Sequence, residues 1–273
     1  MLLLALLAGG CNTRTDDSVA HTLTDEPAVT DANATADALR ALSRRRIYFA
    51  HQSVGNNVLQ GVQAILTSAP GSGVRIIESR DPSTVEGAGI IHFAAGSNGN
   101  PASKNADFIR ALDARAAPDN GIALLKYCYV DVDENTDIDA VFREYEEMVA
   151  GIRRSHPDLT VVHVTMPLTT DDAGPKAVIK RLIGRTTNRD INALRNRYNQ
   201  KLRAGYAGEP IFDLATIEST RSDGSRESAT MGGSEVFALV PGYTYDGGHL
   251  TPDAERVVAE SFIRTLADIA RGR

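Results

Sequence analysis

The chain has 273 residues, of which 42% are hydrophobic and 23% charged, and its formal net charge is −6. This composition is typical of a globular protein, and the length suits one large α/β domain or two small ones. The acidic balance argues against a primary role on nucleic acid or on an anionic membrane surface. The sequence contains only two cysteines, Cys11 and Cys128, so no disulfide framework is expected.

The chain begins with an apolar run that passes through small residues to Cys11. This order resembles the end of a bacterial lipoprotein signal, in which the cysteine becomes the acylated first residue. The run is too short to span a bilayer, which takes about 20 apolar residues. Residues 1–11 are therefore expected to be a lipoprotein-type signal, with Cys11 lipidated and the protein held in a bacterial envelope, periplasmic or extracellular, by this anchor alone. The alternative is an ordinary apolar N-terminus, because no Lys or Arg precedes the run and Ala8 replaces the more usual leucine.

Residues 12–37 are rich in Thr, Asp, Ala, Ser and Asn and have no apolar periodicity. Such a segment cannot bury enough apolar surface to fold, so a disordered tether is expected there. The globular domain is expected to cover residues 38–273.

Within that domain, short apolar runs alternate with segments of helical periodicity. The runs predict strands near residues 46–50, 74–77, 90–94, 122–130, 159–165 and 210–214. The periodic segments predict helices after residue 53 and near residues 106–114, 139–154, 191–202 and 252–270. This alternation predicts a three-layer α/β/α sandwich around a central parallel sheet of about five strands. Active sites in such sheets lie beyond the carboxyl ends of the strands.

Asp246 and His249 stand three residues apart around two glycines, directly before a strong helix start with Thr251 as N-cap and Pro252 after it. A carboxylate beside an imidazole can hold its tautomer and stabilise the imidazolium, as in a Ser-His-Asp triad. Ser53 follows the first predicted strand, so it can reach the same sheet edge. These residues are the candidate catalytic group.

From Ile47 to Phe262 these features resemble the SGNH (GDSL-like) hydrolase family, in which a serine follows the first strand and an Asp-x-x-His pair precedes the last helix. The resemblance implies a flavodoxin-like fold and an SGNH-type esterase with Ser53, Asp246 and His249 as its triad, without a cofactor or metal. It also implies that the backbone N–H groups of Ser53 and Gly96 form the oxyanion hole.

The chain departs from the family pattern at two places. The usual Gly-Asp-Ser is His51-Gln52-Ser53 here, and residues 126–131 stand where the family has an asparagine in a Gly-x-Asn-Asp setting. Loss of one oxyanion donor costs about 3 kcal/mol of transition-state stabilisation. Asn98 and Asn57 are the candidate replacements for this donor.

Three side chains are candidate substrate contacts. These are Tyr245, Asn57 and Lys104. No zinc-binding spacing occurs, and the acids at 131–137 lack the glycine and final glutamate of a calcium loop.

Each catalytic candidate also has a structural explanation. A serine after a strand is often a helix cap, and an Asp-Gly-Gly turn can simply connect two elements. Cys128, His51 and His92 are expected to pack in the core rather than to react.

The expected function is Ser53-dependent hydrolysis of a small-molecule or glycan ester, with an O-acyl group on a glycan as the candidate substrate. One alternative is a non-catalytic envelope lipoprotein that binds a glycan or a protein partner, which the missing asparagine favours. Another is an O-acyltransferase that uses the same triad with a sugar in place of water. The sequence specifies neither the acyl chain nor the oligomeric state.

Overall fold

The computed structural model describes residues 27–172 and 183–272. Its centre is a six-stranded sheet with the order β2-β3-β1-β4-β5-β6, in which neighbouring strands run parallel. The strands are β1 (Arg46–His51), β2 (Ile76–Glu78), β3 (Gly89–Ala94), β4 (Ile122–Leu125), β5 (Thr160–Val164) and β6 (Ile211–Phe212). The predicted α/β sandwich is confirmed, with six strands rather than about five.

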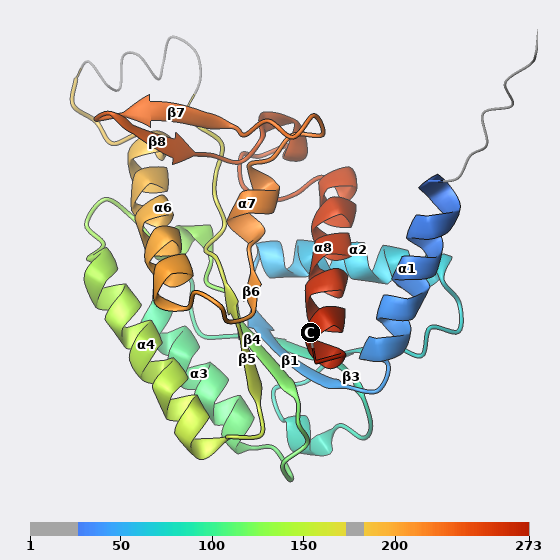
Figure 1. Cartoon of the computed structure of the whole chain (residues 1–273). Coiled ribbons are helices and arrows are strands. Elements are labelled where there is room, and N and C mark those ends of the chain that lie inside the picture. The colour runs from blue at the N-terminus through green and yellow to red at the C-terminus, as the bar shows by residue number, and fades with distance from the viewer. Residues whose placement is uncertain (1–26, 173–182, 273) are drawn as a thin grey trace, which may run out of the picture.

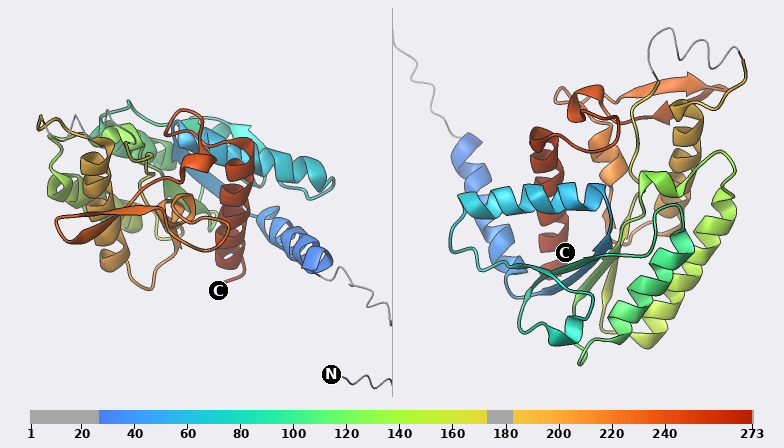
Figure 2. Two further views of the ribbon diagram at one scale, coloured as in Figure 1. Left: turned by 90° about the horizontal axis from the view of Figure 1, so that it is seen from above. Right: turned by 180° about the vertical axis from the view of Figure 1, so that it is seen from behind.

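Helices cover both faces of the sheet, as Figures 1 and 2 show from three directions. One face carries α1 (Pro27–Leu42), α2 (Val54–Ser68), α7 (Leu214–Glu218) and α8 (Pro252–Ala270). The other face carries α3 (Pro101–Asp113), α4 (Ile138–Ser155) and α6 (Asn188–Gly205). Short 3₁₀ turns occur at η1 (Pro82–Thr84), η2 (Tyr129–Asp131) and η3 (Pro241–Tyr243). No helix in the described ranges is long and apolar enough to cross a membrane.

The two halves of the core follow from the alternation of side chains along the central strands. In β1, Ile47 and Phe49 pack under α2 and α8, whereas Tyr48 and Ala50 face α3 and α4. Since successive side chains of a strand point to opposite faces, a strand covered on both sides must be apolar throughout. The four inner residues of β1, from Ile47 to Ala50, meet this requirement.

The crossing of α2 and α8 matters for the site, because α2 begins after Ser53 and α8 begins after His249. A side chain at Gly61 of α2 would place its Cβ 2.2 Å from the carbonyl oxygen of Glu255 in α8. Only glycine allows this approach of the two backbones. The crossing therefore brings the starts of both helices to the same edge of the sheet.

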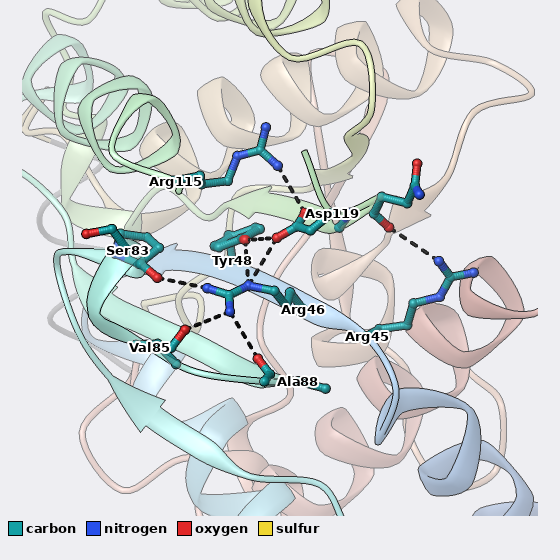
Figure 3. Close-up of polar contacts among 12 residues, drawn as sticks. Arg45, Arg46, Tyr48, Ser83, Val85, Ala88, Arg115 and Asp119 are labelled. Carbon is teal, nitrogen blue, oxygen red and sulfur yellow. Dashed lines mark hydrogen bonds and ion pairs between the residues drawn. The ribbon is translucent and has the colours of Figure 1, made fainter. Parts of the chain in front are cut away.

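A polar network closes the opposite edge of the sheet (Figure 3). The Arg46 guanidinium lies 3.0 Å from the Asp119 carboxylate and donates to the carbonyl oxygens of Pro82 and Val85 at 2.8 and 2.7 Å. Arg115 binds the other oxygen of Asp119 at 3.0 Å. Structural contacts thus fill the amino-terminal edge of the sheet, whereas the candidate catalytic residues lie at the carboxyl-terminal edge.

Two boundaries differ from the sequence prediction. Residues 27–37, assigned to the disordered tether, belong to α1, whose later residues Leu39 and Leu42 are buried in the core. The predicted strand at 122–130 ends at Leu125, and the chain turns into η2. Residues 126–128 are buried all the same, so they continue the core as a loop without pairing in the sheet. The predicted signal at residues 1–11, with Cys11, lies outside the described residues.

A hairpin of β7 (Ser228–Met231) and β8 (Ser234–Phe237) was not predicted. It lies beside α6 at one end of the molecule (Figure 1). Its turn is Gly232-Gly233, with φ of 57° and 81°. Two glycines between short β-prone runs are a recognised signal for such a turn, so the sequence did contain the information.

Candidate active site

Ser53 occupies a sharp turn between β1 and α2 and has an unusual backbone. Its φ is 52° and its ψ is −112°, and Asn120 is the only other non-glycine residue with a positive φ in the described ranges. Such a conformation costs on the order of 1–3 kcal/mol and occurs most often at functional sites. The Ser53 side chain makes no capping hydrogen bond to α2. The helix-cap explanation is therefore wrong for this serine.

Ser53, His249 and Asp246 form a continuous chain of hydrogen bonds. The Oγ atom of Ser53 lies 2.6 Å from Nε2 of His249, and Nδ1 of His249 lies 2.6 Å from Oδ2 of Asp246. With the ring protonated at Nδ1, His249 donates to the carboxylate and accepts from the serine hydroxyl. The side chains of His249 and Asp246 are 45% and 54% exposed, so a substrate can reach the group from solvent.

The Asp246 carboxylate is fixed by its own turn. Its Oδ1 accepts the backbone N–H groups of Gly248 and His249 at 2.9 and 2.8 Å. The hydrogen bonds from the His249 ring, and then from these two N–H groups, hold the pKa of Asp246 well below its usual range. The carboxylate therefore stays ionised at any pH at which the protein would work.

Both glycines of this turn are required by their surroundings. Gly247 has φ of 90°, and a Cβ there would lie 3.0 Å from Oγ1 of Thr170. A Cβ at Gly248 would lie 2.8 Å from the ring of Tyr129. The Asp-Gly-Gly-His segment is thus a tightly packed turn and not simply a flexible connection.

The predicted oxyanion residue Gly96 already has a partner. Its backbone N–H donates to Oδ2 of Asp107 at 2.7 Å. The prediction that this N–H is free for an oxyanion is contradicted, because Asp107 in α3 occupies it. Asn98, the candidate substitute, is exposed, and its Oδ1 accepts a hydrogen bond from Lys104 at 3.1 Å.

Two of the three predicted substrate contacts have structural roles instead. Lys104 is fully buried and forms an ion pair with Asp131 at 2.5 Å. Asn57 donates to Glu255 at 2.6 Å and accepts the backbone N–H of Leu250 at 3.3 Å, so it joins α2 to α8. The third, Tyr245, is 88% exposed beside Asp246 and is available to a ligand.

Sequence reasoning missed Tyr129, which lies directly against the triad. Its ring stands edge-on to the His249 ring, with 5.8 Å between centroids. The only signal for it was indirect, since Tyr129 stands in the stretch that replaces the asparagine expected from the family resemblance.

Within the described part of the chain, no group of three or more His, Cys, Asp and Glu side chains is placed to hold a metal ion.

A buried polar cluster lies on the same face of the sheet as Ser53, at the ends of β1 and β4 and in α7. Lys126 Nζ, Glu218 Oε1 and His51 Nδ1 are buried without a hydrogen-bond partner among the described residues. Burial lowers the pKa of Lys126 to about 8, and burial, reinforced by the charges of Lys126 and His92, lowers that of His51 to about 2. The His51 ring is therefore neutral and acts in packing, as the sequence predicts.

The buried carboxyl of Glu218 is expected to make the stability of the fold depend on pH. Burial raises its pKa from 4.5 to about 8, against the opposing effects of the Leu168 N–H and of Lys126. A carboxyl whose folded pKa is raised favours folding at low pH, and the benefit is lost as pH rises through the folded pKa. We expect the contribution of Glu218 to the free energy of unfolding to fall by roughly 3–5 kcal/mol between about pH 4.5 and 8. The lowered pKa of His51 acts in the opposite direction below pH 6.5, so the Glu218 contribution is measured as the difference between wild type and a Glu218 variant.

The variant Glu218→Gln should remove this dependence of the free energy of unfolding on pH. Glu260→Gln, at a more exposed position in α8, should keep it. Urea unfolding at a series of pH values measures both. A Glu218→Gln variant with the wild-type slope would show that another group causes it.

The strain at Ser53 gives a second stability prediction. Ser53→Gly should raise the free energy of unfolding by about 1 kcal/mol relative to Ser53→Ala, because glycine adopts a positive φ without steric cost. Both variants lose the hydroxyl, so the comparison isolates the backbone. Thermal unfolding of the two variants tests this, and a glycine variant less stable than the alanine variant would contradict it.

No family model and no curated protein matches the chain. Solved structures do match it. A Streptococcus pneumonia protein named for platelet activating factor is 13% identical with a TM-score of 0.46, and the match covers 86% of this chain and 92% of that one.

A Desulfitobacterium hafniense protein assigned to the G-D-S-L lipolytic family is 10% identical with a TM-score of 0.46, covering 81% of this chain and 98% of that one. A peptidoglycan O-acetylesterase is 12% identical with a TM-score of 0.44, covering 68% of this chain and 48% of that one. GDSL-like proteins thus stand among its structural neighbours. The likenesses are distant, so the roles of the site residues rest on the geometry of this chain alone.

Proposed function

We propose that this protein is a serine hydrolase that cleaves esters, with Ser53 as the nucleophile. The observation that carries the proposal is the hydrogen-bonded chain from the strained Ser53 through His249 to Asp246. A serine hydroxyl is a weak nucleophile until a base removes its proton, and His249 Nε2 lies at hydrogen-bond distance for that transfer.

The reaction then runs in two halves. The Ser53 oxygen attacks the acyl carbon as its proton passes to His249, and Asp246 stabilises the imidazolium. Collapse of the tetrahedral intermediate expels the alcohol, which takes the proton back from His249. Water then attacks the acyl-serine with the same base, and the acid is released. The Ser53 N–H lies at the N-terminus of α2, where the helix dipole favours the negative charge of the oxyanion.

The substrate that we propose is an acyl ester on a small molecule or a glycan. The half-exposed triad and the exposed Tyr245 beside it support an open site, which suits an ester carried on a larger polymer. A lipid anchor at Cys11, if processed as its sequence context predicts, would hold the enzyme at the bacterial envelope, close to such polymers.

Hydrolysis of p-nitrophenyl acetate and of longer p-nitrophenyl esters tests the proposal, with Ser53→Ala as the control. We expect activity that depends on Ser53. A transferase would instead produce an acylated sugar, detectable by mass spectrometry, and would release p-nitrophenol faster when a sugar acceptor is added.

Binding of a glycan or partner without catalysis is the second candidate, and one observation favours it. The Gly96 N–H is occupied by Asp107, so a donor expected from the family resemblance is not free. A folded protein that hydrolyses none of the esters and is not acylated at Ser53 would favour binding without catalysis over ester hydrolysis.

A further inference from the structure

The glycine loop offers the proposed reaction few backbone donors. Besides Gly96, the N–H of Ser97 donates to Ser103 Oγ at 2.9 Å, and the N–H of Gly99 donates to Asp131 Oδ1 at 2.8 Å. With the family's asparagine also absent, the oxyanion needs another donor if the triad is to be effective. A loss of one such donor costs about 10²–10³-fold in kcat.

The Tyr129 hydroxyl lies beside the catalytic turn and Ser53. A Cβ built on Gly248 would be 3.0 Å from this hydroxyl, so the phenol reaches the backbone of the catalytic turn. The same phenol interacts with the side chain of Ser53, and its ring stands against His249. Tyr129 follows the end of β4, next to β1, so it approaches the serine from the neighbouring strand.

The backbone and the ring of Tyr129 are both contacted by Arg195. Arg195, which is only 4% exposed, donates from Nε to the carbonyl oxygen of Tyr129 at 3.0 Å, and its guanidinium carbon lies 5.9 Å from the ring centroid. The Arg195 Nη1 is itself fixed by Thr169 at 2.9 Å and by Asn192 at 2.7 Å. A donor fixed in advance in this way needs no reorganisation during the reaction, which is the condition for strong stabilisation of an oxyanion.

We propose that the Tyr129 hydroxyl donates a hydrogen bond to the oxyanion of the tetrahedral intermediate, in place of the missing asparagine. This inference rests on the proposed function. As the Ser53 oxygen bonds to the acyl carbon, the carbonyl electron pair moves to the acyl oxygen and the serine proton moves to His249. Tyr129 shares its proton with that oxygen without transferring it.

The protonation state of the phenol is suited to this task. Burial, with smaller contributions from Cys128 and Asp246, raises the pKa of Tyr129 above its usual value, although the hydrogen bond with Ser53 acts in the other direction. The hydroxyl therefore keeps its proton at neutral pH and remains a donor.

The test is Tyr129→Phe in the full chain, which removes the hydroxyl but keeps the ring against Gly248 and His249. We expect kcat for p-nitrophenyl acetate to fall by about 10²–10³-fold with KM within about threefold of wild type. Tyr206→Phe, at the end of α6, is the matched control and should retain wild-type kinetics.

A merely structural tyrosine would give a different result. An active wild type, an inactive Ser53→Ala and a Tyr129→Phe variant within about threefold of wild-type kcat would overturn this inference and leave the proposed function standing. A wild type that hydrolyses no ester would instead overturn the proposed function.

If the phenylalanine variant unfolds at a lower temperature, kcat is compared at a temperature at which every variant is folded, and 3-fluorotyrosine at position 129 restores the hydroxyl. Recovery of kcat by at least about tenfold over Tyr129→Phe supports donation by the hydroxyl. A fluorotyrosine protein as slow as the phenylalanine variant overturns it.

Discussion

Replacement of His249 by alanine is expected to lower kcat by at least about 10⁴-fold, the largest effect of any variant apart from the loss of Ser53. The imidazole is the only base within hydrogen-bond distance of the serine hydroxyl among the described residues, with 2.6 Å between Oγ and Nε2. Without it the hydroxyl keeps its proton and the leaving alcohol receives none. Steady-state ester hydrolysis measures the loss.

Asp246→Asn should reduce kcat by a similar factor of about 10⁴, because an amide in place of the carboxylate favours the wrong tautomer of the ring. His156→Gln is the matched control, since His156 pairs with Asp113 at the opposite end of the fold and should not affect kcat. A His249→Ala variant that retained more than about a tenth of wild-type kcat would contradict the assigned base.

Replacement of Asp131 by alanine is expected to destabilise the fold by about 3–5 kcal/mol. Asp131 and Lys104 are both fully buried in their side chains and lie 2.5 Å apart. The same carboxylate accepts the N–H groups of Gly99 at 2.8 Å and Cys128 at 2.6 Å. Its removal therefore leaves a buried ammonium without its counter-charge and frees two loops that flank the site.

Urea unfolding compares this variant with two others. The double variant Lys104→Met/Asp131→Ala should recover part of the loss, because no unpaired charge is then buried. Glu260→Gln breaks the exposed pair with Arg256 and should cost less than about 1 kcal/mol. If Asp131→Ala cost no more than Glu260→Gln, the buried pair would not be a structural support.

The arrangement of the candidate catalytic residues could be predicted because it depends on local signals and on simple topology. A serine after the first strand and a histidine before the last helix both lie at the carboxyl edge of a parallel sheet, whatever the details between them. The turn at Gly247 and Gly248 was readable because two adjacent glycines indicate unusual dihedrals or a close approach of the backbone. The structure shows such approaches to Thr170 and Tyr129.

The surroundings of the triad could not be predicted in the same way. Lys104 looks like a surface lysine in sequence, and nothing local reveals its partner Asp131, which is 27 residues away. The Gly96 N–H is taken by the Asp107 carboxylate, a tertiary contact that no pattern encodes. Residues 126–128 are buried although they lie outside the sheet, and burial alone does not distinguish a strand from a core loop.

The central claim is that Ser53 is an activated nucleophile, and labelling with a fluorophosphonate tests it without knowledge of the substrate. The full chain is treated with the probe, and the adduct is located by peptide mass spectrometry. We predict a single adduct on Ser53 that is lost in His249→Ala and retained in His156→Gln. A folded wild-type protein that stays unlabelled at Ser53 would contradict the account.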